Sequence, residues 1–183
     1  MQNQITESFT PGDDFSEYEN CTFKNINFSN LILNSIEFTD CTFVSCDFSM
    51  AKLDRVSLSK IKFIQCKLLG IDFGKCSSSS FSVSFDNCVL NYCLFLKLNV
   101  RKTIFKNCSI KEAVFSESNL SEASFLLCDL SNTVFEKCNL THCDFRTAQN
   151  YSINPSENKI KNALFSYPGV LGLLNQFNIK IEL

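Results

Sequence analysis

The sequence ASFLLCDLSNTVFEKCNLTH, residues 123–142, repeats one pattern every five residues. Each unit has a large apolar residue at its centre, which is Phe125, Leu130, Phe135 or Leu140, and a small residue two positions earlier. A helix repeats its apolar face every ~3.6 residues and an extended strand every ~2, so a period of five fits neither. The chain must therefore turn once per unit, with the centre and the small position inward and the other three residues toward water.

The same pattern extends over most of the chain. Before a slip near residue 74 the centres are Tyr18, Phe23, Phe28, Leu33, Phe38, Phe43, Phe48, Leu53, Leu58, Phe63, Leu68 and Phe73. After the slip they are Phe85, Leu90, Phe95, Val100, Phe105, Ile110, Phe115, Leu120, Phe125, Leu130, Phe135, Leu140 and Phe145. Neither the centres nor the small positions include a charged residue, although 20% of the chain is charged. We infer that both sets are buried.

The units Ala123–Leu127, Cys128–Asn132 and Cys138–His142 match the consensus Ala-(Asp/Asn)-Leu-X-X, and on these units the chain resembles the pentapeptide-repeat family. The resemblance implies an all-β fold, a right-handed quadrilateral β-helix with four units per coil. With four units per coil, the centres from Phe85 to Phe145 would stack phenylalanine on two opposite faces and Leu, Val or Ile on the other two.

The repeat pattern divides the single domain into three parts. Residues 1–15 are predicted to be a polar N-terminal cap, residues 16–165 the β-helix, and residues 166–183 a short C-terminal α-helix with a terminal strand. The frame shifts by two residues within 74–83, where Ser77–Ser80 are expected to form a small loop. Such a loop is either a functional bulge or a tolerated insertion, and the sequence leaves both open.

All eleven cysteines fall on the small positions of the repeat: Cys21, Cys41, Cys46, Cys66, Cys76, Cys88, Cys93, Cys108, Cys128, Cys138 and Cys143. Free cysteine behaves as a small apolar residue, so we predict reduced thiols that fill the core. Their number is odd, no Cys-X-X-Cys occurs, and the only histidine, His142, is on an outward position. We therefore expect no zinc or other metal site and no cofactor.

The C-terminal segment has the apolar pattern of an interface. After Ser166 and Pro168, apolar residues recur at helical spacing and then at alternate positions. The predicted dimer interface comprises Val170, Leu171, Leu173, Leu174, Phe177, Ile179 and Ile181. Family members that act on topoisomerases dimerise through a C-terminal helix and strand, so the resemblance also implies a homodimer.

The composition argues against binding to nucleic acids, against insertion into a membrane and against secretion. The net charge is −2, and outward aromatics such as Tyr92 and Tyr151 are too sparse to stack bases, so no direct nucleic-acid binding is expected. No apolar run approaches the ~20 residues that span a bilayer. The first residues lack the pattern of a signal peptide, which favours a cytoplasmic location without membrane contact.

The inward positions carry no catalytic group. There is one histidine, no glycine-rich phosphate loop and no inward pair of carboxylates, so we expect no enzyme activity. Among pentapeptide-repeat proteins the chain most resembles the gyrase-protecting subgroup, the plasmid quinolone-resistance proteins and the microcin immunity protein. The similarity to the immunity protein is carried by Leu140–Phe145, Ile153–Pro155 and Asn158–Ile160.

That resemblance implies a non-enzymatic, DNA-mimic-like protein that binds DNA gyrase or topoisomerase IV and protects it from quinolones or peptide toxins. The outward residues, sorted into four faces, give no continuous acidic face. The alternative is a structural or adaptor module that binds some other protein. The dimerising C-terminal segment distinguishes the two hypotheses, because general members of the family often lack it.

Overall fold

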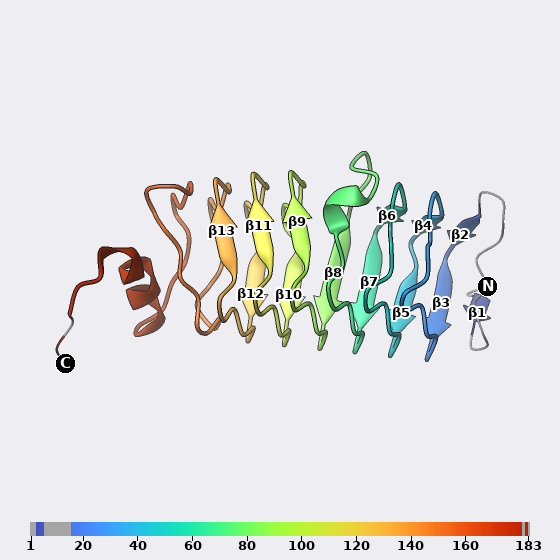
Figure 1. The fold of residues 1–183 in the computed structure, drawn as a ribbon, viewed down its shortest axis with the longest axis horizontal. Coiled ribbons are helices and arrows are strands. Elements are labelled where there is room, and N and C mark those ends of the chain that lie inside the picture. The colour runs from blue at the N-terminus through green and yellow to red at the C-terminus, as the bar shows by residue number, and fades with distance from the viewer. Residues whose placement is uncertain (1–2, 6–15, 181, 183) are drawn as a thin grey trace.

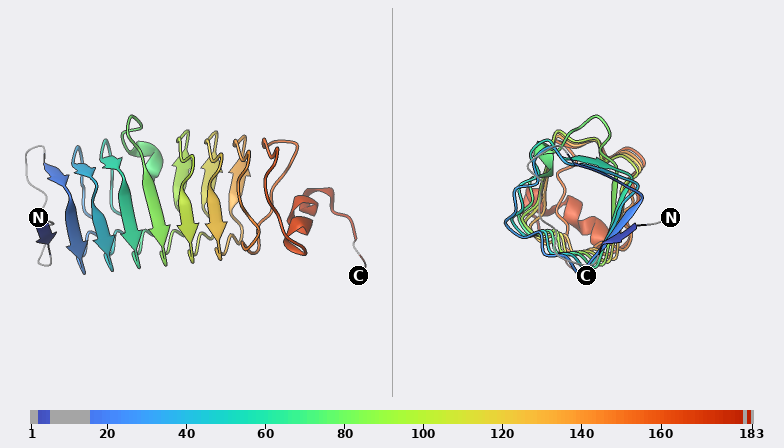
Figure 2. Two further views of the ribbon diagram at one scale, coloured as in Figure 1. Left: turned by 180° about the vertical axis from the view of Figure 1, so that it is seen from behind. Right: turned by 90° about the vertical axis from the view of Figure 1, so that its right-hand side faces the viewer.

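The chain winds into a four-sided solenoid of parallel strands. The computed structural model describes residues 3–5, 16–180 and 182. In Figure 1 the strands lie side by side along the rod, and the end-on view of Figure 2 shows the four sides. Phe38 pairs with both Tyr18 and Leu58, so one coil takes four units of five residues. The expected pentapeptide β-helix is therefore confirmed.

Three sheets form along the sides of the rod. The longest contains β1 (Asn3–Ile5), β3 (Cys21–Lys24), β5 (Thr42–Val44), β7 (Ile61–Ile64), β8 (Val83–Asp86), β10 (Ile104–Lys106) and β12 (Ser124–Leu126). The second contains β2 (Glu17–Glu19), β4 (Glu37–Thr39) and β6 (Ser57–Ser59). The third contains β9 (Leu94–Leu96), β11 (Val114–Ser116) and β13 (Val134–Glu136). Isolated bridges such as Asp47 to Lys67 continue the pairing on the remaining side.

A left-handed residue closes most corners of the coils. Asn25, Lys60 and Glu122, each two residues after a centre, have φ of 56°, 54° and 61°. A residue with a side chain adopts this conformation at a cost, which local hydrogen bonding can offset. Here the corner N–H donates to a carbonyl of the next coil, as from Asn25 to Val44 at 3.0 Å. The corner is thus part of the cross-coil ladder, and it does not need glycine.

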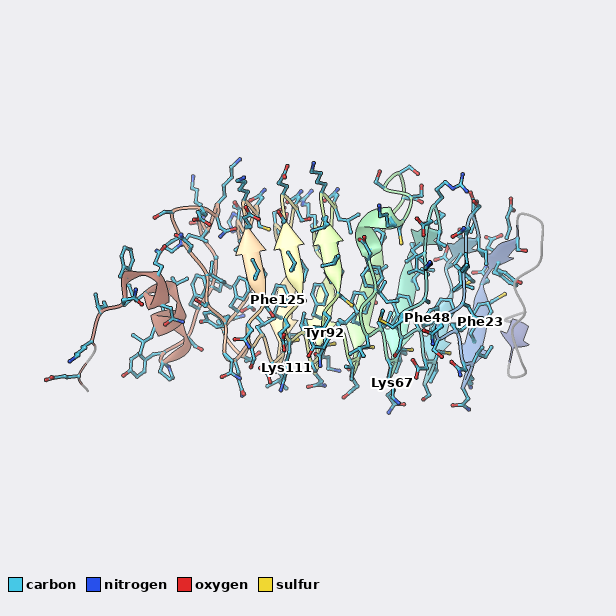
Figure 3. The ribbon with its side chains drawn as sticks, viewed as in Figure 1. Phe23, Phe48, Lys67, Tyr92, Lys111 and Phe125 are labelled. Carbon is cyan, nitrogen blue, oxygen red and sulfur yellow. The ribbon has the colours of Figure 1, made fainter. Side chains whose placement is uncertain are left out.

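Aromatic rings stack along the core as predicted. On one side Phe105 and Phe125 stack with ring centroids 4.8 Å apart, and on the opposite side Phe95 and Phe115 stack at 4.5 Å. The two columns meet edge to face, because the rings of Phe105 and Phe115 are 6.1 Å apart and inclined by 89°. In Figure 3 Phe125 lies within the rod. Such contacts add about 0.5–1.5 kcal/mol per pair beyond burial and hold adjacent coils in register.

The small positions are buried, and all eleven cysteines are buried and free of disulfides. This confirms the prediction that they are core residues. Polar residues also occur at small positions where a carbonyl of the preceding coil can accept their hydrogen bond. Ser118 donates to Phe95 O at 2.9 Å, and Asn158 donates to Phe135 O at 2.9 Å. A buried polar group is tolerated there because it is satisfied.

The frame shift is a loop at one corner. After the 3₁₀ helix η1 (Phe73–Lys75), Ser78–Ser80 are exposed, and Figure 1 shows the loop projecting from the rod. Beyond it Ile61 pairs with Val83, two residues further than the usual spacing. Phe81 folds back onto Phe73, with ring centroids 6.0 Å apart, and closes the core beneath the loop.

Both ends differ in detail from the sequence-based expectation. In place of an α-helix, the C-terminal segment contains two 3₁₀ helices, η2 (Gly169–Leu173) and η3 (Asn175–Phe177). Residues 178–180 form no strand. A segment this short gains little from α-helical hydrogen bonds, and η3 ends at Asn178, whose φ is 48°. At the other end residues 3–5 form β1 on β3, and the rest of the predicted cap lies outside the described residues.

Candidate interaction surfaces

The described part of the chain contains no arrangement typical of a catalytic or chelating site. No three or more His, Cys, Asp or Glu side chains converge within residues 3–5, 16–180 and 182. His142 is exposed, and its ring contacts only Asn162, at 3.5 Å, among the described side chains. No helix in these residues has the length and apolarity to span a bilayer. The exposed apolar and charged side chains of the rod form its candidate interaction surfaces.

The C-terminal segment rests directly on the last coil. The N–H of Ile153 donates to the carbonyl of Gly172 at 3.2 Å. A Cβ atom on Gly172 would lie 2.2 Å from the carbonyl oxygen of Tyr151, and one on Gly169 would lie 2.7 Å from the Tyr151 hydroxyl. Both distances are too short for any side chain. The two glycines therefore allow the segment to approach the core closely.

Tyr151 is buried, which corrects the prediction that it faces outward. Only 4% of its surface is exposed, and its ring packs against Phe145 at 5.6 Å and Phe165 at 5.9 Å. Its hydroxyl has no hydrogen-bond partner among the described residues, and burial raises its pKa. Sequence reasoning missed this role because the five-residue period is interrupted after Phe145.

The predicted interface residues separate into two groups. Leu173 packs against the core, and Val170, Leu171 and Leu174 are half-buried. These four residues help to seal the last coil. Phe177 and Ile179 are 56% and 55% exposed, and Ile181 lies outside the described residues. The exposed part of the set is thus at the tip of the rod, at the left end of Figure 1.

Tyr167 and Leu127 extend the apolar surface beyond the predicted set. They are 70% and 61% exposed. Each stands two residues after a centre, at an outward corner, and this position in the repeat could have identified them. Leu127 also lines a cavity of about 670 Å³ between the last coil and the C-terminal segment, together with Arg146 and Leu171.

Seven ion pairs join charged side chains of neighbouring coils among the described residues. Lys106 reaches Asp86 at 3.0 Å, and Lys111 reaches Asp129 at 2.9 Å. Partial burial raises the pKa of Asp129, but hydrogen bonds from Asn150, Ser131 and Lys111 outweigh it and hold the pKa well below its usual range. In Figure 3 Lys67 and Lys111 lie along the lower edge of the rod.

Carboxylates without an ion pair occur at several places along the rod. Within the described ranges, Glu17, Glu19 and Glu37 form no ion pair, and they lie on β2 and β4 near the N-terminus. The carboxylates that are paired belong to Asp40, Asp47, Asp86, Glu117, Glu122, Asp129, Glu136 and Asp144. Unpaired carboxylates are thus not confined to the N-terminal end, because five more of the described residues also lack an ion pair: Asp54, Asp72, Glu112, Glu157 and Glu182.

Comparisons with known proteins agree with this architecture. The family profile described as pentapeptide repeat region matches residues 36–114 and 78–154. Among solved structures, the chain is similar to a trypsin-treated form of QnrB1, a plasmid-mediated fluoroquinolone resistance protein. The identity is 23%, the TM-score is 0.52, and the match covers 99% of this chain and 98% of that one.

A second similar structure is HetL from the cyanobacterium Nostoc sp. strain PCC 7120, a pentapeptide repeat protein involved in the regulation of heterocyst differentiation. Its identity is 13% and its TM-score 0.46, over 90% of this chain and 87% of that one. No match was found among curated protein sequences. At these identities the structural likeness establishes the fold alone.

Proposed function

The chain belongs to the pentapeptide-repeat family, and on this basis we propose that it binds a type II topoisomerase, DNA gyrase or topoisomerase IV, and protects it from quinolones or peptide toxins. The observation that supports this most is the extent of the match to QnrB1. It covers 99% of this chain and 98% of that one, so it includes both the coils and the C-terminal segment. The proposed action is non-enzymatic and consists of binding alone.

The protein would act as a homodimer joined at its C-terminal tips. Phe177, Ile179 and Tyr167 present exposed apolar surface beyond the last coil. Exposed side chains of this size that lie close together commonly mark an interface. A two-fold axis at the tip would join two rods end to end, with the same residues contributed by each copy.

Shape would contribute more to topoisomerase binding than negative charge does. Cross-coil ion pairs neutralise several of the carboxylates, and the unpaired ones, such as Glu17, Asp72 and Glu112, lie apart from one another along the rod. A protein that mimicked DNA mainly through its charge would lose affinity steeply as salt screens the contact. Binding measured between 50 and 200 mM salt should accordingly weaken by less than about tenfold, whereas a charge mimic would lose ~10³-fold or more.

The direct test is DNA supercoiling by purified gyrase, with a fixed dose of a quinolone or, in parallel, of a peptide gyrase poison. Titration of the protein should restore supercoiling and reduce drug-stabilised DNA breaks. For variants at the C-terminal tip, Lys24→Ala is the matched control in this assay, because Lys24 lies on β3 at the opposite end of the rod from the proposed dimer contact. If no dose restores supercoiling with either gyrase or topoisomerase IV, the proposal is wrong. The structural or adaptor role then takes its place, with the partner to be found by affinity capture.

A further inference from the structure

The outer surface of the longest sheet has a groove over three adjacent strands. It lies across β7, β8 and β10 and has a volume of about 200 Å³. Figure 1 shows these strands side by side in the middle of the rod. Outside the core residues Phe63 and Phe85, the groove is lined by Lys62, Ile64, Ser84, Asp86, Ile104 and Lys106. We call it the β8 groove.

The register of the strands explains why the surface is hollow there. Lys62 pairs with Ser84 across β7 and β8, and the register of β8 with β10 places Ile104 on the other side of Ser84. A short side chain thus stands between two long ones in the same outward row. The Ser84 hydroxyl is turned to the backbone, where it donates to Ile61 O at 3.5 Å. The space above Ser84 is therefore left open.

The walls of the β8 groove offer apolar surface to a partner. Ile104 is 50% exposed on one wall, and Ile64 is half-buried on the other, across β8. Ile64 also pairs with the half-buried Val44 of β5, which continues the apolar surface toward the N-terminus. An apolar side chain of a partner placed between the two isoleucines would remove both from water, which is favourable.

The one unpaired charge around the groove is positive. The Asp86 carboxylate is fully occupied, because Oδ1 accepts from Asn87 at 2.7 Å and Oδ2 lies 3.0 Å from Lys106 Nζ. Lys62 is exposed and forms no ion pair within the described ranges. The strands β5, β7, β8, β10 and β12 carry no further charge. The groove therefore favours a negatively charged partner group.

We propose that the β8 groove is a docking site for an acidic, apolar segment of a partner protein. A large aliphatic or aromatic side chain of the segment enters the groove between Ile64 and Ile104, and a neighbouring carboxylate pairs with Lys62. Apolar burial supplies most of the affinity, and the charge selects the partner. A nucleic acid fits less well, because phosphate binding draws on several cations and the groove has one that is unpaired. The proposal adds to the topoisomerase hypothesis and does not depend on it.

The probe is the capped peptide Gly-Leu-Glu-Phe-Glu-Gly, compared with a charge-reversed form that has Lys in place of both Glu residues. Methyl NMR spectra of isoleucine-labelled protein report the contact, because Ile64 and Ile104 both line the groove. The acidic peptide should shift these two methyl signals progressively as it is added. The basic peptide should leave them nearly unchanged, because its ammonium groups are repelled by Lys62.

Two variants test the wall and the charge separately. Ile104→Ser should weaken binding of the acidic peptide by about tenfold, as followed at the Ile64 methyl group. Lys62→Gln should weaken it by about threefold, because an exposed ion pair contributes less. The matched controls are Ile32→Ser and Lys52→Gln. Ile32, which is 55% exposed, and Lys52 are bridged neighbours in successive coils and do not line the groove, so both controls should bind as the wild type does.

Circular dichroism first establishes that all four variants are folded. The proposal is overturned if neither groove methyl signal shifts with the acidic peptide, if both peptides bind equally, or if the controls weaken binding as much as the groove variants. A short DNA duplex that shifts the same signals more than the acidic peptide does would assign the groove to nucleic acid instead. Sedimentation of Lys62→Gln alone covers the remaining occupant, because a mass lower than that of the wild type would place a second copy of this chain in the groove.

Discussion

Tyr151 is the residue on which the C-terminal segment rests. Its ring closes the stack of Phe145 and Phe165, and its carbonyl lies against Gly172. Its hydroxyl is nonetheless buried without a partner among the described residues. Tyrosine at this position packs well but leaves a polar atom unsatisfied. It therefore stabilises the fold less than phenylalanine, which has the same shape without the hydroxyl, would.

Tyr151→Phe should therefore stabilise the protein. Removal of a buried, unsatisfied hydroxyl is expected to raise the free energy of unfolding by about 1 kcal/mol. Chemical denaturation of the wild type and the variant measures the change. Tyr167→Phe is the control, because Tyr167 is 70% exposed and its hydroxyl is solvated. A loss of stability in Tyr151→Phe would mean that the hydroxyl has a partner after all.

The buried thiol of Cys93 should make stability depend on pH in the alkaline range. Burial raises the pKa of this thiol from 9.0 to about 12. Below pH 9 both folded and unfolded chains keep the proton, so the contribution is fully present. As pH rises from 9 toward 12 only the unfolded chain loses the proton, and the free energy of unfolding falls by about 1.4 kcal/mol per pH unit for this group.

Cys93→Ala removes that contribution. Denaturation curves at pH 8, 9 and 10 should show a shallower alkaline loss of stability in the variant than in the wild type. Other groups that titrate in this range are common to both proteins and cancel in the comparison. Equal slopes would show that the Cys93 thiol ionises as easily in the core as in the unfolded chain.

At the scale of elements, the coil is the unit that the sequence specifies best. Cross-coil pairing, ring stacking and the left-handed corner all recur at one spacing, as from Phe105 to Phe125. The exception is the corner at Ser77–Ser80, where two added residues project without altering the ladder on either side. The coil therefore tolerates an insertion at a corner, because the inward positions resume in register after it.

Deletion of Ser78 and Ser79 should leave the fold intact. The Ser77–Ser79 hydroxyl contact, at 3.1 Å, is lost, and the Ser57–Ser80 contact, also 3.1 Å, can persist. Because exposed loop residues contribute little, the free energy of unfolding should change by less than about 1 kcal/mol. Thermal unfolding checks this. A folded deletion variant can then be used in the supercoiling assay, where lost protection would identify the loop as a contact and full protection as a tolerated insertion.

At the scale of the whole molecule, the two ends of the rod differ. Near the N-terminus unpaired carboxylates lie on β2 and β4, and at the C-terminus exposed apolar side chains extend past the last coil. Exposed apolar side chains at the C-terminal end favour a closed two-fold dimer, in which each copy contributes the same surface. The asymmetry of the rod is thus consistent with the proposed dimer.

Phe177→Asp should convert the proposed dimer into a monomer without unfolding it. Phe177 is 56% exposed, so a charge at this position meets water in the monomer and an apolar partner only in the dimer. Sedimentation at several protein concentrations measures the mass, and circular dichroism reports the fold. Leu174→Asp is a less specific variant, because Leu174 is half-buried against the rod. A Phe177→Asp protein that still sediments as a dimer would place the interface elsewhere.

The sequence by itself determined the repetitive part of this protein. A period of five dictates which side chains face inward, so the burial of the cysteines and the stacking of Phe85 to Phe145 followed from spacing alone. These features repeat every coil, and each depends on neighbours at a fixed distance along the chain. Wherever the repeat continues without interruption, the five-residue spacing is therefore sufficient to predict which side chains are buried and which stack.

Only the tertiary structure decided what happens where the repeat stops. Tyr151 turned inward, and the C-terminal segment formed 3₁₀ helices, because the open face of the last coil has to be covered by whatever chain follows it. Most ion pairs between coils, in contrast, join residues 20 positions apart, such as Asp86 and Lys106, so the repeat itself brings them together. Beyond the last repeat the contacts are set by proximity in space, and no periodicity in the sequence specifies them.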